Sequence, residues 1–447
     1  MRLKSGWAQT IGLVFAAFAG GAVTSQLAFA TTHAESPYAP FDQLARVLML
    51  VENQYVDPAQ RTKVVEGAIK GMVAELDPHS AYMTAEEYRV FQGETEGKFG
   101  GVGVEVDYRN DFVTVIAPIE GSPAARAGIR PGDQIVTVNG RPMRGERLDK
   151  LVLLMRGPPG SKLRMSVRRK GVTEPISFDL TREEIRITSV VIKRLDGDIG
   201  YVRLKQFQEG THIELLRGAA ALRKASNRPL AGVILDMRNN PGGLVDEAEA
   251  ISDEFLNDGS IYSTRHRGKI VDEVKARAGG AFAAMPVVVL VNEYSASSAE
   301  LVAGALQDSK RATVVGAQTF GKGSVQTIYD LPGGAGMRLT TMRYYTPSGR
   351  SIQAEGIKPD ILIEEPQVTG AAPPDIVRER DLEGHLASET GKTPTERPSV
   401  KIEGTAPQDP DAELGGPREI PINPLKGSDF TLSIAYQRLL KTIGEKR

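Results

Sequence analysis

Cysteine is absent from this chain of 447 residues. Its absence excludes disulfide bonds, cysteine-ligated zinc, iron–sulfur clusters and cysteine nucleophiles. Histidine is scarce, with five residues, and none lies in a motif typical of a metal site or of the base of a serine nucleophile. An excess of positive charge is also missing, because 55 Lys and Arg face 56 Asp and Glu. We therefore expect no metal, no other cofactor and no nucleic-acid partner.

The first thirty residues have the layout of a secretory signal peptide. Arg2 and Lys4 precede a mostly apolar run from Ile11 to Val23, which is short for a membrane span, and Ala28-Phe29-Ala30 has the small-x-small pattern of a cleavage site. We expect residues 1–30 to be removed and the mature chain to reside in the periplasm or another extracytoplasmic compartment. An uncleaved membrane anchor is the alternative.

Residue patterns divide the remaining chain into five parts of a multidomain α+β protein. Apolar residues recur at helical spacing in an N-terminal helical region, residues 31–97. Short β-branched runs separated by glycine and proline turns predict a β-rich module over 98–182. Strand-like and helical runs alternate over 183–365, which predicts an α/β core. Proline, glycine and charge over 366–424 are typical of a flexible linker, and 425–447 contain a short amphipathic helix.

Two stretches of the β-rich module indicate a site for the end of a peptide. Three glycines between residues 100 and 103 come just before a strand, where backbone N–H groups can form an anion-binding nest. Residues 121–140, GSPAARAGIRPGDQIVTVNG, closely resemble the PDZ domain signature. The resemblance implies that a C-terminal tail adds as a strand, with its carboxylate on the loop of Gly101, Val102, Gly103 and Val104. A glycine-rich hairpin of an unrelated barrel is the alternative.

Two segments of the core each follow a strand-like run and precede a predicted helix. Residues 235–244, LDMRNNPGGL, form a glycine turn whose N–H groups can approach a substrate oxygen closely, as an oxyanion hole requires. Residues 292–300, NEYSASSAE, place serines where a helix begins. A serine at such an elbow is exposed near the positive end of the helix dipole, which suits a nucleophile.

A serine nucleophile needs a base, and a lysine is the candidate here. Residues 319–326, TFGKGSVQ, place Lys322 between two glycines. Burial can lower the pKa of a lysine toward neutrality, at a cost of about 4 kcal/mol against the charged form. Gln326 follows four residues later and can hold the lysine by a hydrogen bond without adding a charge. A plain surface charge is the alternative for Lys322.

Together these motifs resemble the C-terminal processing peptidases, or tail-specific proteases, which are serine–lysine peptidases with a PDZ domain. The resemblance covers about residues 41–365. It implies that Ser297 is the nucleophile, that Lys322 is the general base and that Gln326 completes a triad. The module over 98–182 would then be the PDZ domain and the α/β core the protease.

Three serines lie within four positions, so the nucleophile must be chosen among them. Ser295 can cap the helix, which is the commonest role of a serine in that place, and the resemblance favours Ser297. It also implies an oxyanion hole made by backbone N–H groups of Gly242 or Gly243 and of Ser298. It further suggests that Arg156 couples the PDZ domain to the protease, for which a surface arginine in a turn is the alternative. We expect Asp308 to have a structural role.

The function implied is that of a secreted serine endopeptidase, which captures unstructured protein C-termini and cleaves the chain through an acyl-enzyme. The resemblance suggests envelope proteins as substrates and a lipoprotein adaptor as a partner. The N-terminal helices and the final helix are candidate surfaces for a homo-oligomer. Two other classes stay open. A non-catalytic PDZ scaffold has no use for the set Ser297, Lys322 and Gln326, and a cell-wall amidase or esterase leaves the PDZ signature unexplained.

Overall fold

The computed structural model describes residues 38–109, 112–146, 148–225, 228–364, 376–388, 399–404 and 420–445. The expected signal peptide lies outside the described residues. The chain divides into two compact units, Met1–Met72 and Val73–Arg447. None of the described helices is long and apolar enough to cross a membrane.

The first unit contains helix α2 (Ala39–Gln54) and most of α3 (Arg61–Ala74), as the helical spacing predicts. Large apolar side chains of α2 are exposed, among them Phe41, Val47 and Leu50. A helix that leaves such side chains exposed has an apolar surface available for association.

The second unit begins with strand β1 (Ala81–Met83) and helix α4 (Ala85–Thr95). A capping box fixes the beginning of α4, because the Thr84 backbone N–H donates to Glu87 at 2.8 Å and the Glu87 N–H donates to Thr84 Oγ1. β1 adds to a mainly antiparallel sheet whose other strands lie far along the chain: β13 (Ser260–His266), β14 (Lys269–Lys275), β17 (Ser324–Asp330) and β18 (Gly336–Tyr345).

The β-rich module forms its own sheet around its own core. Six strands and two short helices make it: β3 (Val104–Arg109), β4 (Phe112–Pro118), α5 (Pro123–Arg126), β5 (Gln134–Val138), β6 (Arg141–Pro142), α6 (Leu148–Met155), β7 (Lys162–Arg168) and β8 (Ile176–Thr181). Side chains of alternate strand residues, such as Leu163, Met165 and Val167, fill this core. A separate ribbon of β2 (Lys98–Gly101) and β9 (Glu183–Arg186) marks where the chain enters and leaves the module.

The α/β core is a seven-stranded sheet in the order β10-β11-β12-β15-β16-β19-β20. β10 runs antiparallel to β11, and the other neighbours are parallel. The strands are β10 (Val190–Leu195), β11 (Ile199–Leu204), β12 (Gly232–Asp236), β15 (Val287–Val291), β16 (Ala312–Gly316), β19 (Ile361–Glu364) and β20 (Val400–Glu403). The mixture of these units confirms a multidomain α+β protein.

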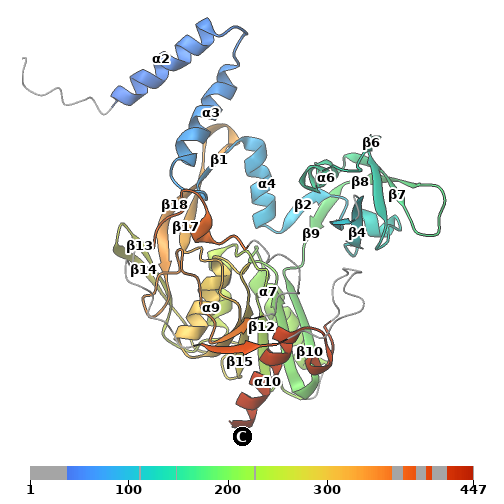
Figure 1. Cartoon of the computed structure of the whole chain (residues 1–447), viewed down its shortest axis with the longest axis vertical. Coiled ribbons are helices and arrows are strands. Elements are labelled where there is room, and N and C mark those ends of the chain that lie inside the picture. The colour runs from blue at the N-terminus through green and yellow to red at the C-terminus, as the bar shows by residue number, and fades with distance from the viewer. Residues whose placement is uncertain are drawn as a thin grey trace, which may run out of the picture. The chain divides into compact units, whose positions relative to one another are not determined.

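Helices cover both faces of this sheet (Figure 1). Val233 and Leu235 of β12 pack in one core with α7 (Thr211–Lys224), α8 (Val245–Asp253) and α9 (Ser298–Asp308). Ile234, between them, packs in the opposite core with α10 (Phe430–Glu445). Because both faces are covered, the central strands are apolar throughout, which explains their continuous hydrophobic runs.

The stretch expected as a flexible linker, residues 366–424, is structured where it is described. β20 adds to the core sheet in parallel with β19, and residues 376–388 contain a short 3-10 helix, Glu379–Asp381. Composition alone missed these elements because their order depends on contacts with distant residues. The expected C-terminal helix is present as α10, and it begins at Phe430.

Candidate active site

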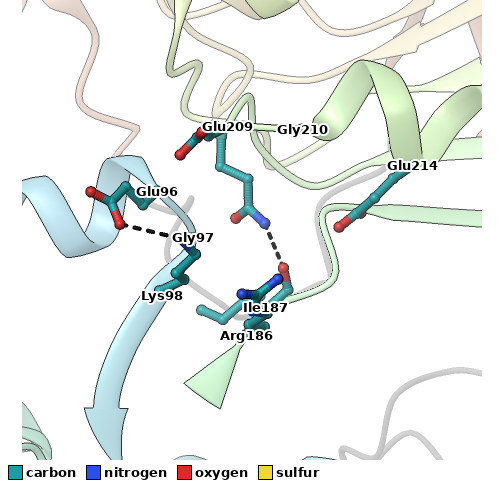
Figure 2. Close-up of a pocket in the computed structure, with 9 residues that line it drawn as sticks. Glu96, Gly97, Lys98, Arg186, Ile187, Glu209, Gly210 and Glu214 are labelled. Carbon is teal, nitrogen blue, oxygen red and sulfur yellow. Dashed lines mark hydrogen bonds and ion pairs between the residues drawn. The ribbon is translucent and has the colours of Figure 1, made fainter. Parts of the chain in front are cut away.

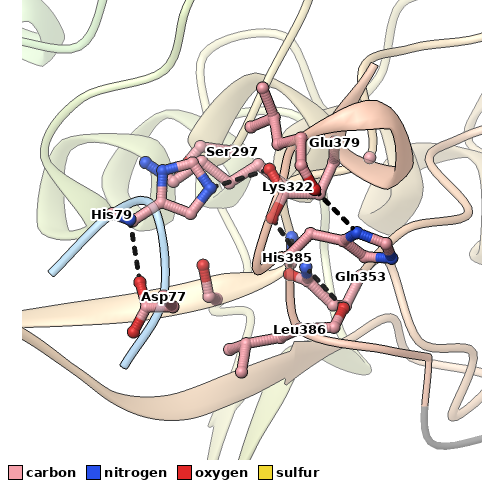
Figure 3. A network of polar contacts seen from close by, with 12 residues as sticks. Asp77, His79, Ser297, Lys322, Gln353, Glu379, His385 and Leu386 are labelled. Atoms are coloured by element: carbon pink, nitrogen blue, oxygen red, sulfur yellow. Dashed lines mark hydrogen bonds and ion pairs between the residues drawn. The ribbon is translucent and has the colours of Figure 1, made fainter. Parts of the chain in front are cut away.

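The three segments that sequence patterns single out meet at one edge of the core sheet. β12 and β15 are parallel neighbours, so the glycine turn after β12 and the serine segment after β15 leave the sheet on the same side. β16 follows β15 in the same direction and leads to the loop that contains Lys322. Figure 3 shows Ser297 and Lys322 in one polar cluster.

Ser297 lies directly before α9 with φ 54° and ψ −118°. A left-handed backbone is costly for a residue with a Cβ, and such strained turns are typical of exposed nucleophiles. The hydroxyl groups of the two neighbouring serines are engaged elsewhere. Ser295 donates to the Met237 carbonyl at 2.8 Å and does not cap the helix, and Ser298 donates to the Gly243 carbonyl at 2.9 Å. These contacts support Ser297 as the nucleophile.

The pKa of Lys322 is lowered, in the direction that the sequence analysis predicts. Burial is the largest cause, and the Arg338 guanidinium adds to it. The carboxylates of Glu379, Asp77 and Glu300 act in the opposite direction. The lowered pKa makes the neutral amine, the form that can accept a proton from a serine, easier to reach than at an exposed lysine.

The glycine turn packs directly against Ser297. Gly242 has φ 100°, and a Cβ placed on it would lie 2.8 Å from Ser297 Cβ. Its N–H donates to Asn240 Oδ1 at 2.9 Å, so this group is already engaged. The N–H groups of Gly243 and Ser298 have no acceptor among the described residues. Of the two glycines proposed for the oxyanion hole, Gly243 is therefore the one with an available donor.

A buried ion pair holds the strand end from which this turn departs. Asp236 is fully buried, and the Tyr201 hydroxyl donates to it at 2.7 Å. Burial opposes its charge, but the Arg238 guanidinium outweighs burial and lowers the pKa of Asp236. Arg238 also donates twice to Asp429, at 3.0 and 2.8 Å, just before α10 begins. The last helix is thus tied to the glycine turn.

Glu300 is the residue of this site for which the sequence analysis found no role. It is fully buried in the first turn of α9. Oε2 accepts from the backbone N–H groups of Ser297 and Lys322, both at 2.8 Å. Oε1 accepts from the Gly321 N–H at 2.7 Å and from the Thr319 hydroxyl at 2.5 Å. One carboxylate therefore connects Ser297 to the loop that contains Lys322.

Burial is also the main influence on the charge of Glu300. It raises the pKa of Glu300 to about 7, against hydrogen bonds that favour the carboxylate.

A signal for Glu300 is present in the sequence, because Ser-x-x-Glu before an apolar run is the pattern of a capping box. That pattern predicts the contact with Ser297, but not the three contacts with residues 319–322.

The hydrogen bonds of Gln326 go to residues other than the lysine. Its amide nitrogen donates to Ser324 Oγ at 2.9 Å and to Thr340 Oγ1 at 3.5 Å. No hydrogen bond between Gln326 and Lys322 exists among the described residues. Its place in a triad stays a prediction.

Asp308 accepts hydrogen bonds from Arg350 at 2.8 Å and from Ser348, as a structural residue would.

Known proteins resemble the chain over most of its length. Residues 198–363 match peptidase family S41, 114–169 a PDZ domain, and 18–87 the activating protease CtpB N-terminal domain. A carboxy-terminal-processing protease of Bartonella bacilliformis is 42% identical over 359 residues, which are 80% of this chain and 82% of that protein. This chain belongs to the carboxy-terminal-processing proteases. It is therefore a serine-type peptidase with a PDZ domain.

More distant relatives of this protease differ in how much of their length is matched. A probable CtpA-like serine protease of Staphylococcus aureus is 37% identical over 332 residues, which are 74% of this chain and 66% of that protein. Among solved structures, the photosystem II D1 C-terminal processing protease is 30% identical. The match covers 71% of this chain and 91% of that one, with a TM-score of 0.44.

The loop expected to bind a peptide carboxylate lies between β2 and β3 of the PDZ domain. The carbonyl of Val102 accepts from the Ala124 N–H, and that of Gly103 accepts from the Ile119 N–H, both at 2.9 Å. The N–H groups of Val102 and Gly103 have no acceptor in the described part of the chain. Gly103 has φ 75°, and a Cβ there would lie 2.3 Å from Ser122 Cβ. This geometry leaves the donors of a nest available.

The PDZ domain joins the protease core where the β2–β9 ribbon ends. Figure 2 shows a pocket at this junction, lined by residues at the beginning of β2, at the end of β9 and at the beginning of α7. Gln208 lines this pocket, and its amide donates to the Ile187 carbonyl at 2.5 Å. Nearby, Arg156 at the end of α6 donates to Glu94 of α4 at 2.7 Å and lies 5.1 Å from the Phe99 ring centroid. Its role as a coupler stays a prediction.

Gly242→Ala is expected to lower kcat about 100-fold or more, because the new Cβ would displace Ser297 or the turn. Gly268→Ala is the matched control, since Gly268 also has a positive φ, 78°, but a Cβ there meets nothing within 4 Å. It should cost about 1–2 kcal/mol of stability and leave kcat unchanged. Steady-state kinetics on a peptide substrate measure both. Equal losses of kcat in the two variants would refute a specific contact with the nucleophile.

Glu300→Gln is expected to change how stability depends on pH. The pKa of Glu300 in the folded chain, about 7, lies above its ordinary value of 4.5, so the folded state binds this proton more tightly between those pH values. The stabilising contribution of this group therefore falls as the pH rises from 4.5 to 7. Urea unfolding should show the free-energy difference, wild type minus variant, decreasing by on the order of 3 kcal/mol over that window. A difference independent of pH contradicts the raised pKa.

Proposed function

We propose that this protease is a secreted serine–lysine endopeptidase that binds protein C-termini through its PDZ domain and hydrolyses peptide bonds at Ser297. The observation that carries the proposal is the double contact of Glu300 with the backbone N–H groups of Ser297 and Lys322. A nucleophile and its base must keep a fixed relative position, and one rigid acceptor shared by both provides it.

The first chemical step is the attack of Ser297 on the substrate carbonyl. Neutral Lys322 accepts the proton of the Ser297 hydroxyl as its oxygen forms a bond to the carbonyl carbon. Negative charge then develops on the carbonyl oxygen, where the N–H groups of Gly243 and Ser298 can donate to it. The lowered pKa of Lys322 supports this step, because a lysine of ordinary pKa is protonated at neutral pH.

The second half of the reaction releases the two products. Lys322 returns the proton to the leaving amine as the peptide bond breaks, which leaves an acyl-enzyme on Ser297. Water then attacks the acyl group, with Lys322 again accepting and returning a proton. Gln326 would have to move from Ser324 toward Lys322 to orient the base directly.

Tail capture is the proposed role of the PDZ domain. A substrate's terminal carboxylate would accept hydrogen bonds from Val102 and Gly103, while its last residues pair as a strand. The proposed compartment is extracytoplasmic, from the signal-peptide layout of residues 1–30. Envelope proteins are the proposed substrates, a lipoprotein adaptor is a proposed partner, and the exposed apolar side chains of α2 support self-association.

Ser297→Ala and Lys322→Ala should each abolish cleavage of a reporter protein with a disordered C-terminal tail. Lys269→Ala, at an exposed lysine of β14, is the control that should retain activity. Mass spectrometry of the products measures cleavage, and circular dichroism checks the fold. Full activity in Lys322→Ala would refute the mechanism. A wild-type chain that binds tails without turnover would support the scaffold, and hydrolysis of small esters alone would support an esterase.

Replacing the tail carboxylate by a carboxamide should raise KM about 10-fold or more, because one charged acceptor is lost from the nest. Gly103→Ala should abolish this discrimination, since its new Cβ meets Ser122. Gly171→Ala, which has φ 83° in the same domain and open space around it, should retain the discrimination. Equal KM values for both tails with the wild-type protease would exclude carboxylate recognition.

A further inference from the structure

Residues 376–388, which we call the strap, pack against the loop that contains Lys322. The Arg378 guanidinium donates to the carbonyl groups of Gln318 and Thr319, both at 2.8 Å. The backbone N–H of Glu379 donates to the Phe320 carbonyl at 3.2 Å. Three successive residues just before the lysine loop's glycine are thus held by two residues of the strap.

The strap also inserts a buried carboxylate next to this loop. Glu379 is fully buried, with Oε2 at 2.7 Å from His79 Nε2 and Oε1 accepting from the Gln353 amide at 2.8 Å. The Gln353 oxygen in turn accepts from the Gly323 N–H at 3.0 Å, directly after Lys322. Figure 3 shows Glu379, His79 and Gln353 gathered about Lys322. Residues separated by 300 positions, His79 and Glu379, therefore meet near Lys322.

Burying a carboxylate is costly, so its position beside a lysine calls for an explanation. Burial opposes the charge of Glu379, but hydrogen bonds from His79 and Gln353 and the nearby charge of Lys322 outweigh it, and the pKa of Glu379 is lowered. Glu379 is therefore an anion that faces the base. A connection with a purely structural purpose could use a neutral side chain at this position.

We propose that the strap is a part of the active site in which Glu379, held by His79 and Gln353, is a positioning residue that controls when Lys322 gives up its proton. The inference rests on the proposed role of Lys322 as the base. The charged groups facing Lys322 are Arg338, which favours its neutral form, and Glu379, Asp77 and Glu300, which favour its charged form. Those facing Glu379 are His79 and Lys322.

The two contributions of the strap can be separated. The Glu379 charge stabilises protonated Lys322, so it raises the pH at which the base becomes active. The Arg378 contacts fix the backbone of residues 318–319 and carry no such effect. Removing the charge should shift the acidic limb of the pH profile of kcat/KM, that is, the part in which activity rises with pH. Removing the Arg378 contacts should instead lower kcat at every pH.

Glu379→Gln tests the charge, because glutamine has the same size and can keep hydrogen bonds to Gln353 and His79. The acidic limb of kcat/KM, measured on the tailed reporter, should shift to lower pH by about 0.5 unit or more. Glu383→Gln, the same change at an exposed position of the strap, should leave the limb in place. Arg378→Ala should lower kcat without moving the limb.

His79→Gln provides a variant of opposite sign. It removes the ring that contacts Glu379 Oε2 at 2.7 Å, so the Glu379 carboxylate loses a hydrogen-bond partner and acts more strongly on Lys322. The acidic limb should therefore shift to higher pH. An unmoved limb in both Glu379→Gln and His79→Gln would overturn the proposal and leave Glu379 a purely structural role. If Glu379→Gln fails to fold, the shift of the acidic limb in His79→Gln tests the proposal by itself. A shift to higher pH supports the proposal, and any other result overturns it. Failure of the proposed function is distinguishable, because Lys322→Ala would then remain active.

Discussion

The buried carboxylate of Glu300 is the interaction on which the catalytic arrangement depends. Hydrogen bonds to a charged group contribute about 1.5–3 kcal/mol each, and Glu300 receives four of them, three from backbone N–H groups. Removing a carboxylate from water costs several kcal/mol, which is why its pKa remains raised to about 7 in spite of them. The result is a rigid connection between the beginning of α9 and the loop of Lys322.

Polar contacts between residues distant in the chain also hold the glycine turn and the strap. Arg238 connects the end of β12 to Asp429 before α10, and Glu379 connects the strap to His79. In each case a buried charge near the site is paired with a residue distant in the chain. A loop placed at the edge of a parallel sheet has few apolar contacts of its own, so directional polar contacts must fix its geometry.

Sequence patterns predicted the parts of the site that are local. Ser297, Lys322 and the glycines stand within short motifs, and the alternation of strands and helices predicted the core that brings them together. The partners of Glu300, the buried place of Glu379 and the contacts of Gln326 could not be predicted in this way. They depend on residues that are separated by many positions, as His79 and Glu379 are by 300. The strap also has a polar composition that resembles a linker, and only its tertiary contacts give it structure.

The balance of charge about Lys322 fits the role of base proposed for this lysine. Burial and Arg338 lower the pKa of Lys322, while three nearby carboxylates act to raise it. These carboxylates also fix the loop of the amine. Glu300 accepts from the backbone of Gly321 and Lys322, and Glu379 holds Gln353, which accepts from the Gly323 N–H. If burial and Arg338 did not oppose the three carboxylates, the amine would stay protonated and could not accept a proton, as the proposed mechanism requires. The site therefore uses anions to hold the loop and uses burial, together with one nearby cation, to offset their electrostatic effect on the base.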